Sequence, residues 1–88
     1  MYYVYILQSE IDNNFYTGYT GNLSRRFKEH QTGKVKSTEE RRPLNLVYYE
    51  SCLHKWDAKH REKYLKTSWG NRYIKNRMKY YLKNSDSV

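Results

Sequence analysis

The first twenty residues of the chain hold two runs of strand-forming residues separated by a polar turn. Tyr2–Gln8 is apolar, aromatic and β-branched in character, and Phe15–Thr20 is similar. The stretch 9–14 between them is rich in turn residues, so the two runs predict a β-hairpin. Leu44–Glu50 has the same character and predicts a third strand.

Helical periodicity marks three other segments. Leu23, Phe27 and His30 recur at spacings of four and three, which predicts a helix that runs to about Gln31. Asn22 is its expected N-cap and Gly33 its expected stop. Two further helices are predicted over residues 54–67 and 71–83. The order β-β-α-β-α-α predicts an α+β fold, with helices flanking a three-stranded mixed antiparallel sheet.

Length and composition assign the remaining segments. A chain of 88 residues can form one domain with a single core, which we place over residues 1–83. The polar residues 84–88 predict a flexible tail. Residues 33–43 are polar and basic and predict a mobile loop on the surface.

The chain is strongly basic, with 17 Lys and Arg against 9 Asp and Glu and a formal net charge of +8. This surplus favours polyanionic partners: DNA first, RNA as an alternative, and an anionic membrane surface as a weaker one. No run approaches the roughly 20 apolar residues that span a bilayer. The first seven residues lack the features of a signal peptide, and Cys52 has no second cysteine to pair with, so we expect a cytoplasmic protein.

Ionisable residues interrupt the apolar faces of two predicted helices. Arg26 and His30 fall on the apolar face of the first helix, and Glu62 falls between Ala58 and Leu65 on the second. Burial of an unpaired charge is costly, so two interpretations stay open. Arg26 and Glu62 form a buried ion pair, or Arg26 lines a cleft for an anion and Glu62 binds a hard cation together with substrate phosphate.

Strand alternation brings two tyrosines toward the same region. Alternate side chains share a face of a sheet, so a suitable hairpin register places Tyr5 and Tyr16 on the same side. Gly18 leaves space beside them, as a glycine within a strand does where another group must come close. Two tyrosines, one arginine and one carboxylate are therefore predicted to converge.

A set of short motifs, in order along nearly the whole chain, resembles the GIY-YIG nuclease domain. The similarity runs through two strand triplets, a helix start and a later glutamate: Tyr3-Val4-Tyr5, Tyr16-Thr17-Gly18, Asn22-Leu23 with Arg25-Arg26 and His30, and Glu62. Further motifs resemble the small stand-alone members of the family, which are similar to the nuclease domain of an excinuclease: Arg41-Arg42-Pro43, Ala58, Arg61-Glu62 and Leu65-Lys66. The chain departs from the pattern at three positions: Tyr3 instead of Gly, Thr17 instead of Ile, and Tyr19 where some members have Lys.

The resemblance implies a metal-dependent endonuclease that hydrolyses phosphodiester bonds in DNA, with Mg²⁺ or Mn²⁺ as cofactor. The residues at the family's active-site positions are Tyr5, Tyr16, Arg26, His30 and Glu62. Glu62 would hold the metal, Arg26 would donate to phosphate oxygens, and one of the two tyrosines would take the proton from water. An ordinary tyrosine has a pKa of about 10, so we expect the metal and Arg26 to lower that pKa. His30 would relay a proton or contact phosphate, or serve as a hydrogen-bonded residue at the edge of the site.

Two groups of basic residues are candidates for binding nucleic acid. One lies in the predicted loop and the other on the last predicted helix: Lys34, Lys36, Arg41 and Arg42, and then Arg72, Lys75, Lys79 and Lys83. Neither group includes a base-reading motif, so we expect salt-sensitive binding with little sequence specificity. Specificity would then come from DNA shape, a flap or junction, or a protein partner in repair or recombination. A non-cleaving nucleic-acid-binding module or an adaptor for a repair complex is the alternative function.

Overall fold

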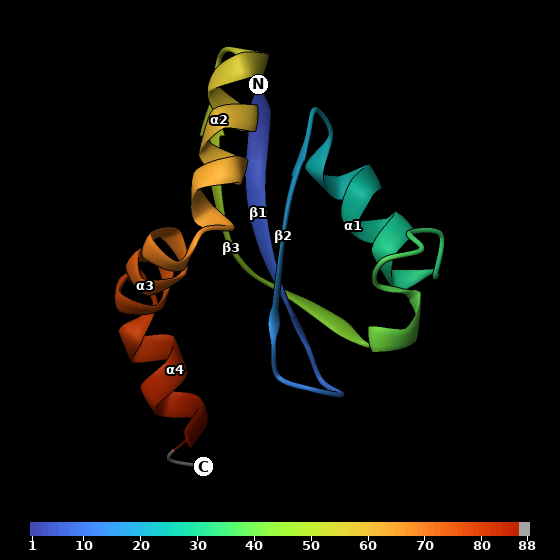
Figure 1. Cartoon of the computed structure of the whole chain (residues 1–88). Coiled ribbons are helices and arrows are strands. Elements are labelled where there is room, and N and C mark those ends of the chain that lie inside the picture. Colours follow the sequence, from blue (N-terminus) through green and yellow to red (C-terminus); the bar gives the residue numbers. More distant parts are fainter. Residues whose placement is uncertain (87–88) are drawn as a thin grey trace.

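A computed structural model describes residues 1–86 of the protein, with side chains described up to Lys83. Its centre is a three-stranded sheet in the order β2-β1-β3, formed by β1 (Tyr2–Ser9), β2 (Phe15–Thr20) and β3 (Leu44–Cys52). Both pairings are antiparallel, and the first two strands form the predicted hairpin (Figure 1). The predicted α+β class with a three-stranded sheet is confirmed.

Five helical elements flank this sheet. They are α1 (Leu23–Gln31), the 3₁₀ helix η1 (Glu39–Arg41), α2 (Lys55–Leu65), α3 (Ser68–Arg77) and α4 (Lys79–Asp86). In Figure 1, α1 covers one face of the sheet, whereas α2, α3 and α4 follow one another along the opposite side. Among residues 1–86, no helix has the length and apolar character needed to cross a lipid bilayer.

The central strand β1 is buried on both faces because each face is covered by helices. Val4 and Ile6 pack into one core cluster, whose other buried members come from α2, α3 and Met78. Tyr5 and Leu7 point the opposite way and pack with Leu44, next to side chains of α1. The alternation predicted from the sequence therefore separates two cores, and Tyr5 belongs to the one beneath α1.

The start and end of α1 follow the sequence signals. The Asn22 side chain caps the helix by accepting a hydrogen bond of 3.0 Å from the Arg25 backbone N–H. The helix ends at Gln31 with Thr32 as its C-cap, and Gly33 has a positive φ of 78°, a conformation that glycine adopts at little cost. Both ends were predicted, because capping depends on residues that are adjacent in sequence.

The single helix predicted over residues 71–83 is wrong, because two helices occupy this region. Thr67 caps α3 by accepting a hydrogen bond from the Gly70 N–H, so the helix begins at Ser68. It stops at Met78, whose side chain is buried in the core. The next helix, α4, then approaches β1, where the Tyr81 hydroxyl donates to the Gln8 side chain. It extends to Asp86, into the predicted tail, and the last two residues of that tail lie outside the described part.

Residues 33–43 lie at the surface, as predicted, but contacts with the rest of the fold anchor the segment. Val35 and Thr38 are buried, and Arg41 forms an ion pair of 3.0 Å with Asp12 in the β1–β2 turn. Ser9 Oγ also donates to the Arg41 carbonyl oxygen at 2.7 Å. The composition of the segment is polar, but contacts with a turn far away in sequence anchor it against β1.

We expect Gly70→Ala to destabilise the protein. An added Cβ would collide with the Tyr64 carbonyl oxygen and lie 2.5 Å from the Leu65 Cα, and these backbone atoms cannot rotate away. Overpacking typically costs about 1–3 kcal/mol, which exceeds the gain of up to about 1 kcal/mol in helix propensity. Urea unfolding should show a lower free energy of unfolding. Gly21→Ala is the control, because its Cβ would meet only ordinary contacts at 3.7 Å; an equal effect of both changes would contradict the prediction.

Candidate active site

Three aromatic rings from three elements meet beneath α1. Tyr5 comes from the middle of β1, Tyr16 from β2 and His30 from the last turn of α1. The ring centroids lie 5.6 Å apart for Tyr5 and His30, 5.2 Å for Tyr16 and His30, and 6.5 Å for the two tyrosines. The structure thus brings these three predicted site residues together.

Gly18 is required by the position of Tyr5. The two residues are paired across β1 and β2, and a Cβ on Gly18 would collide with the Tyr5 hydroxyl and lie 2.5 Å from its Cζ. The missing side chain therefore lets the phenol lie across the neighbouring strand, toward the edge of the sheet. This is the close approach that the sequence predicted for this glycine.

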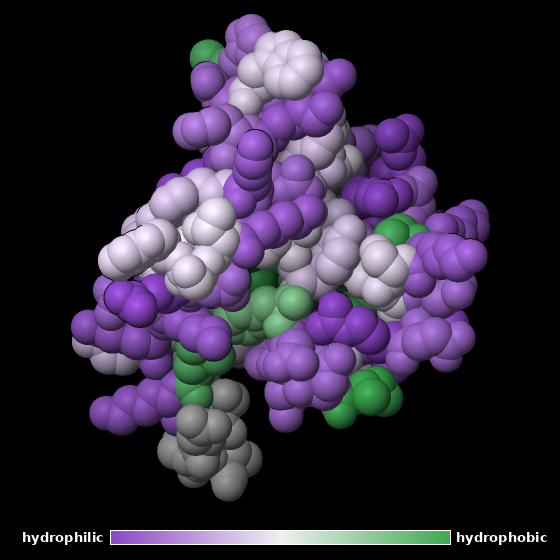
Figure 2. All heavy atoms as spheres, in the orientation of Figure 1, coloured by the Kyte–Doolittle hydropathy of each residue, from purple (hydrophilic) through white to green (hydrophobic). Residues whose placement is uncertain are grey.

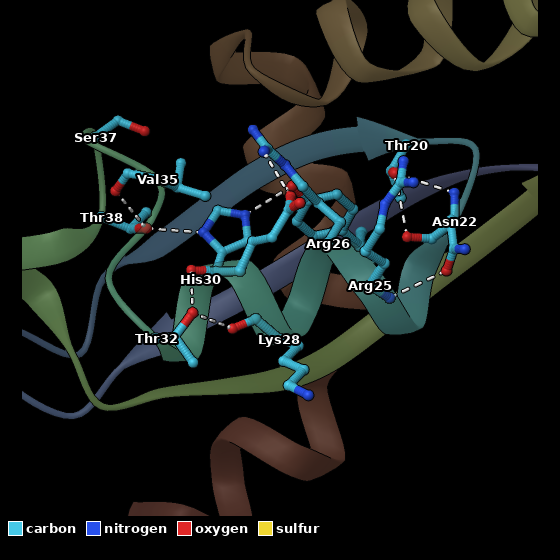
Figure 3. Close-up of polar contacts among 12 residues, drawn as sticks. Thr20, Asn22, Arg25, Arg26, Lys28, His30, Thr32, Val35, Ser37 and Thr38 are labelled. Atoms are coloured by element: carbon cyan, nitrogen blue, oxygen red, sulfur yellow. Dashed lines mark hydrogen bonds and ion pairs between the residues drawn. The ribbon is translucent and has the colours of Figure 1, made fainter.

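A chain of hydrogen bonds fixes Tyr5 and His30, and Figure 3 shows its part between His30, Thr38 and Val35. His30 is fully buried; its Nε2 lies 2.8 Å from the Tyr5 hydroxyl and its Nδ1 lies 2.7 Å from Thr38 Oγ1. The Thr38 hydroxyl also donates to the Val35 carbonyl oxygen at 3.4 Å. If that hydroxyl donates to Val35, it accepts from Nδ1–H, and Nε2 then accepts from the Tyr5 hydroxyl. This assignment makes Tyr5 the donor and neutral His30 the acceptor.

The pKa values favour the neutral form of both groups. Burial raises the pKa of Tyr5 to about 12, although Arg26 lowers it, and the charges of Tyr16 and Glu62 raise it further. Burial, together with the charge of Arg26, lowers the pKa of His30 to about 4. Arg26 lowers the pKa of Tyr5, as expected, but loss of hydration outweighs the guanidinium; the additional effect expected of a metal ion stays a prediction.

The buried His30 should make stability depend on pH between about 6.5 and 4. In this window the unfolded chain binds a proton at His30 and the folded protein does not, so the free energy of unfolding falls as the pH is lowered. His30→Gln removes that titration. Urea unfolding at several pH values should show a smaller loss of stability for the variant than for the wild type. Parallel pH profiles of the two proteins would contradict this prediction.

Arg26 and Glu62 do not form the ion pair that was one interpretation of the sequence. Arg26 Nη1 lies 3.1 Å from Glu29 Oε1, and Glu62 Oε2 lies 3.2 Å from Lys66 Nζ. Each charge finds an opposite charge one turn away on its own helix, and the two helices lie on opposite sides of the sheet (Figure 1). Both residues still act on Tyr5, since each contributes to its pKa. Glu62 therefore lies on a different side of the sheet from Arg26, and only its charge reaches Tyr5.

The side chains present fit a divalent cation held mainly by substrate. Within the described residues, no group of three or more His, Cys, Asp or Glu side chains is placed to hold a metal ion. Glu62 is 21 % exposed and its exposed partner Lys66 can move away. Carboxylate oxygens are ligands that Mg²⁺ accepts, and Mg²⁺ is often held by one carboxylate plus substrate phosphate and water. Glu62 therefore suits such an ion.

The basic loop lies beside the site, but its four cationic residues differ in availability. Ser37 Oγ lies 3.5 Å from the Tyr16 hydroxyl, which places the loop next to the aromatic cluster. Lys34 and Lys36 are both exposed. Arg41 is bound to Asp12, and the Nε of the exposed Arg42 donates to the Glu39 carbonyl oxygen at 2.9 Å. The two lysines are thus the freer cations near the cluster.

The second basic group lies away from the loop. Arg72 and Lys75 are on α3, whereas Lys79 and Lys83 are on α4, so the predicted stripe is divided between two helices. These helices lie on the side of the sheet opposite α1 (Figure 1). The two groups therefore cannot form one patch above the aromatic cluster.

Sequence reasoning missed the contacts of two polar residues, Thr38 at this site and Arg61 on α2. Thr38 lies in a polar segment without periodicity, and only the folded chain shows its contact with His30. Arg61 makes two hydrogen bonds of 2.9 Å with Glu50 of β3. Helical spacing gives the face of Arg61 but cannot reveal a carboxylate on a distant strand.

Comparison with known proteins decides the family. A profile of the GIY-YIG catalytic domain matches residues 1–73. The chain belongs to the GIY-YIG family. A UPF0213 protein of Clostridium perfringens is 46% identical over 67 residues, which cover 75% of this chain and 71% of that protein. A UPF0213 protein of Staphylococcus haemolyticus is 46% identical over 67 residues, covering 75% of this chain and 80% of that protein.

A solved structure supports the same assignment. The solution NMR structure of a UPF0213 protein from Bacillus halodurans has 36% sequence identity and a TM-score of 0.53, covering 84% of this chain and 82% of that chain. In this GIY-YIG domain the two strand triplets lie side by side on β1 and β2, with Tyr5 opposite Gly18. Where some members carry a lysine, Tyr19 faces α2, and Lys59 Nζ lies 5.6 Å from its ring centroid. A cation is thus near this position, although it comes from another element.

Proposed function

We propose that this GIY-YIG domain is a divalent-metal-dependent endonuclease that hydrolyses phosphodiester bonds in DNA with little sequence specificity. The observation that carries the proposal is the buried hydrogen bond between Tyr5 and His30 in a site where Arg26 and Glu62 both act on the phenol. Buried polar pairs with strongly shifted pKa values are typical of functional sites. Family membership narrows the chemistry to nucleases.

The proposed reaction begins with the transfer of a proton from the attacking water. Tyr5 accepts this proton while it gives its own hydroxyl proton to His30 Nε2 across the 2.8 Å hydrogen bond. The water oxygen attacks phosphorus as the bond to the leaving oxygen breaks, and the leaving oxygen takes a proton from solvent water. Arg26 donates to the non-bridging phosphate oxygens. Because the charge of Arg26 lowers the pKa of His30, a phosphate bound at Arg26 offsets that effect. Substrate binding would therefore prepare His30 to accept a proton.

Glu62 is the proposed metal ligand, and Mg²⁺ or Mn²⁺ the proposed cofactor. A bound divalent ion at this site would supply Lewis-acid stabilisation of the phosphate charge. Glu62 must first release Lys66, and the incoming phosphate offers that ammonium group another anion. The salt bridge would thus keep the carboxylate in place before substrate arrives.

The proposed substrate is DNA, with RNA as an alternative, and the proposed location is the cytoplasm. The net charge of +8 favours contacts with phosphate that weaken as salt rises. Shape, such as a flap or junction, or a partner protein would then provide selectivity. Such an activity would serve DNA repair or recombination.

The decisive experiment is cleavage of plasmid and branched DNA by purified protein with Mg²⁺, Mn²⁺ or EDTA. Wild type should cut with metal only, and Glu62→Gln should cut at least about 10²-fold more slowly, since it removes the charge that holds the metal. The glutamine keeps the shape of the partly exposed side chain, so the fold should be retained. Equal cutting by the two proteins would point to a contaminating nuclease and overturn the proposal.

A non-cleaving nucleic-acid-binding module or adaptor is the alternative function. Two observations favour it: the pKa of Tyr5 is raised to about 12, and Glu62 is already paired with Lys66. Both features would slow the hydrolysis of DNA and leave the binding of DNA unaffected. Tight DNA binding without cleavage in any metal would support this alternative, and co-purification with a repair protein would support the adaptor.

A further inference from the structure

The positive charge of this protein is concentrated in the region of α2, α3 and α4. Ten of the 17 Lys and Arg residues lie between positions 55 and 83, together with only two of the nine Asp and Glu residues. This third of the chain therefore carries a formal charge of +8, equal to that of the whole protein, and the rest is balanced. A polyanion would be attracted mainly to these helices.

The same helices carry an unusual number of exposed aromatic rings in contact with cations. Residues 1–86 contain six such pairs, and every one includes a side chain of α2, α3 or α4. A cation within about 6 Å of a ring centroid is attracted by the ring's negative face, so these pairs hold rings and cations together on the helices. Trp56 and Trp69 are 64% and 68% exposed, although tryptophan is normally mostly buried.

Each tryptophan is held by a cation and keeps much of its surface open. Lys59 Nζ lies 5.0 Å from the Trp56 ring centroid, and the Arg72 guanidinium lies 5.0 Å from that of Trp69. On the same helices, the Arg61 guanidinium lies 4.8 Å from the ring centroid of Tyr73. Figure 2 shows this side as mainly hydrophilic, with near-neutral side chains, drawn white, over the start of α2 and over α3. We call Trp56, Lys59, Trp69 and Arg72 the aromatic–basic face.

We propose that the aromatic–basic face binds single-stranded nucleic acid, with Trp56 and Trp69 stacked on unpaired bases and Lys59 and Arg72 contacting phosphates. Exposed rings alternating with cations are what proteins use to bind single strands without reading sequence. Bases in a duplex are already stacked on one another, so a duplex could use the cations but not the rings.

This face also leads toward the candidate active site. Lys59 and Glu62 are three residues apart on α2, and side chains at that spacing are neighbours on a helix. A single strand held by Trp56 and Lys59 would therefore pass close to the proposed metal ligand. The inference rests on the proposed function in one respect. It identifies the segment of the nuclease substrate next to Glu62 as unpaired.

Binding can be tested separately from cleavage by fluorescence anisotropy in EDTA. The probes are an oligothymidylate of about 30 nucleotides and a duplex of about 30 base pairs, each labelled with a dye, and the whole chain is used. Trp56→Ala and Trp69→Ala should each weaken oligothymidylate binding by about 5- to 150-fold, which corresponds to the roughly 1–3 kcal/mol per stacked base. Binding of the duplex should change by less than about twofold.

Two sets of control variants separate stacking from charge and from misfolding. Trp56→Phe and Trp69→Phe keep a stacking ring and should retain most of the affinity. Tyr49→Ala removes an aromatic that is 54% exposed, but this residue pairs with Tyr5 across β1 and β3 and packs on Tyr3, away from the aromatic–basic face. It should change neither affinity. Circular dichroism checks that each variant is folded.

Unchanged oligothymidylate binding in both alanine variants, or an equal loss for single strand and duplex, would overturn the inference. Absence of cleavage with this binding pattern intact would instead remove only the nuclease proposal. Cleavage by a protein whose oligothymidylate binding does not depend on Trp56 or Trp69 would overturn the single-strand inference and leave the nuclease proposal intact. The two proposals therefore fail in different experiments.

Discussion

Tyr5→Phe is expected to lower the rate of DNA cleavage by roughly 10²–10⁴-fold, the usual contribution of a positioned acid or base. The change removes one hydroxyl, which is the atom that bridges the attacking water and His30 Nε2 in the proposed reaction. The phenyl ring still fills the space beside Gly18 and Leu44 in the core. DNA binding should therefore be preserved while single-turnover cleavage is lost.

Tyr49→Phe provides the matched control for this change. Tyr49 is paired with Tyr5 across β1 and β3, but it is 54% exposed and packs on Tyr3. Loss of its hydroxyl should leave the cleavage rate unchanged. Retention of more than about a tenth of wild-type activity by Tyr5→Phe, well above the loss expected for a general base, would rule out Tyr5 as the proton acceptor and shift attention to Tyr16.

Arg26→Ala is expected to reduce cleavage by roughly 10²–10³-fold, as removal of a preorganised donor to a developing anion does. Its guanidinium is partly exposed and forms an ion pair with Glu29 on its own helix, so it is available to phosphate oxygens. Arg26→Lys should restore only part of the rate, because an ammonium group lacks the planar fork of donors. The measurement is kcat and KM on an oligonucleotide substrate in a fixed salt concentration.

Arg25→Ala is a close control for Arg26→Ala, since it removes the same charge one residue earlier. Arg25 is exposed and lies on a different face of the helix from Arg26, so its loss should raise KM modestly and leave kcat unchanged. Equal effects of the two variants on kcat would show that only net charge matters, and would contradict the proposed role of Arg26.

Much of the fold is readable from local sequence. The alternation in β1 predicted which side chains share a face, and the structure places Val4 with Ile6 and Tyr5 with Leu7. Asn22 predicted the start of α1 because an N-cap bonds to the backbone three residues later. The break at Met78 was not predicted, since it depends on how α3 and α4 pack against the sheet rather than on helical periodicity.

For the candidate site, the sequence by itself predicted which residues are candidates for the chemistry and on which faces Tyr5, Tyr16, Arg26 and His30 lie. Only the tertiary structure decided their charge states and partners. The pKa of Tyr5 rises because burial outweighs Arg26, and His30 is neutral because it is buried where a loop residue, Thr38, folds back onto it. Periodicity and capping depend on neighbours along the chain. Hydration and ion pairing depend instead on every group that packs around a side chain, and only the complete fold fixes those groups.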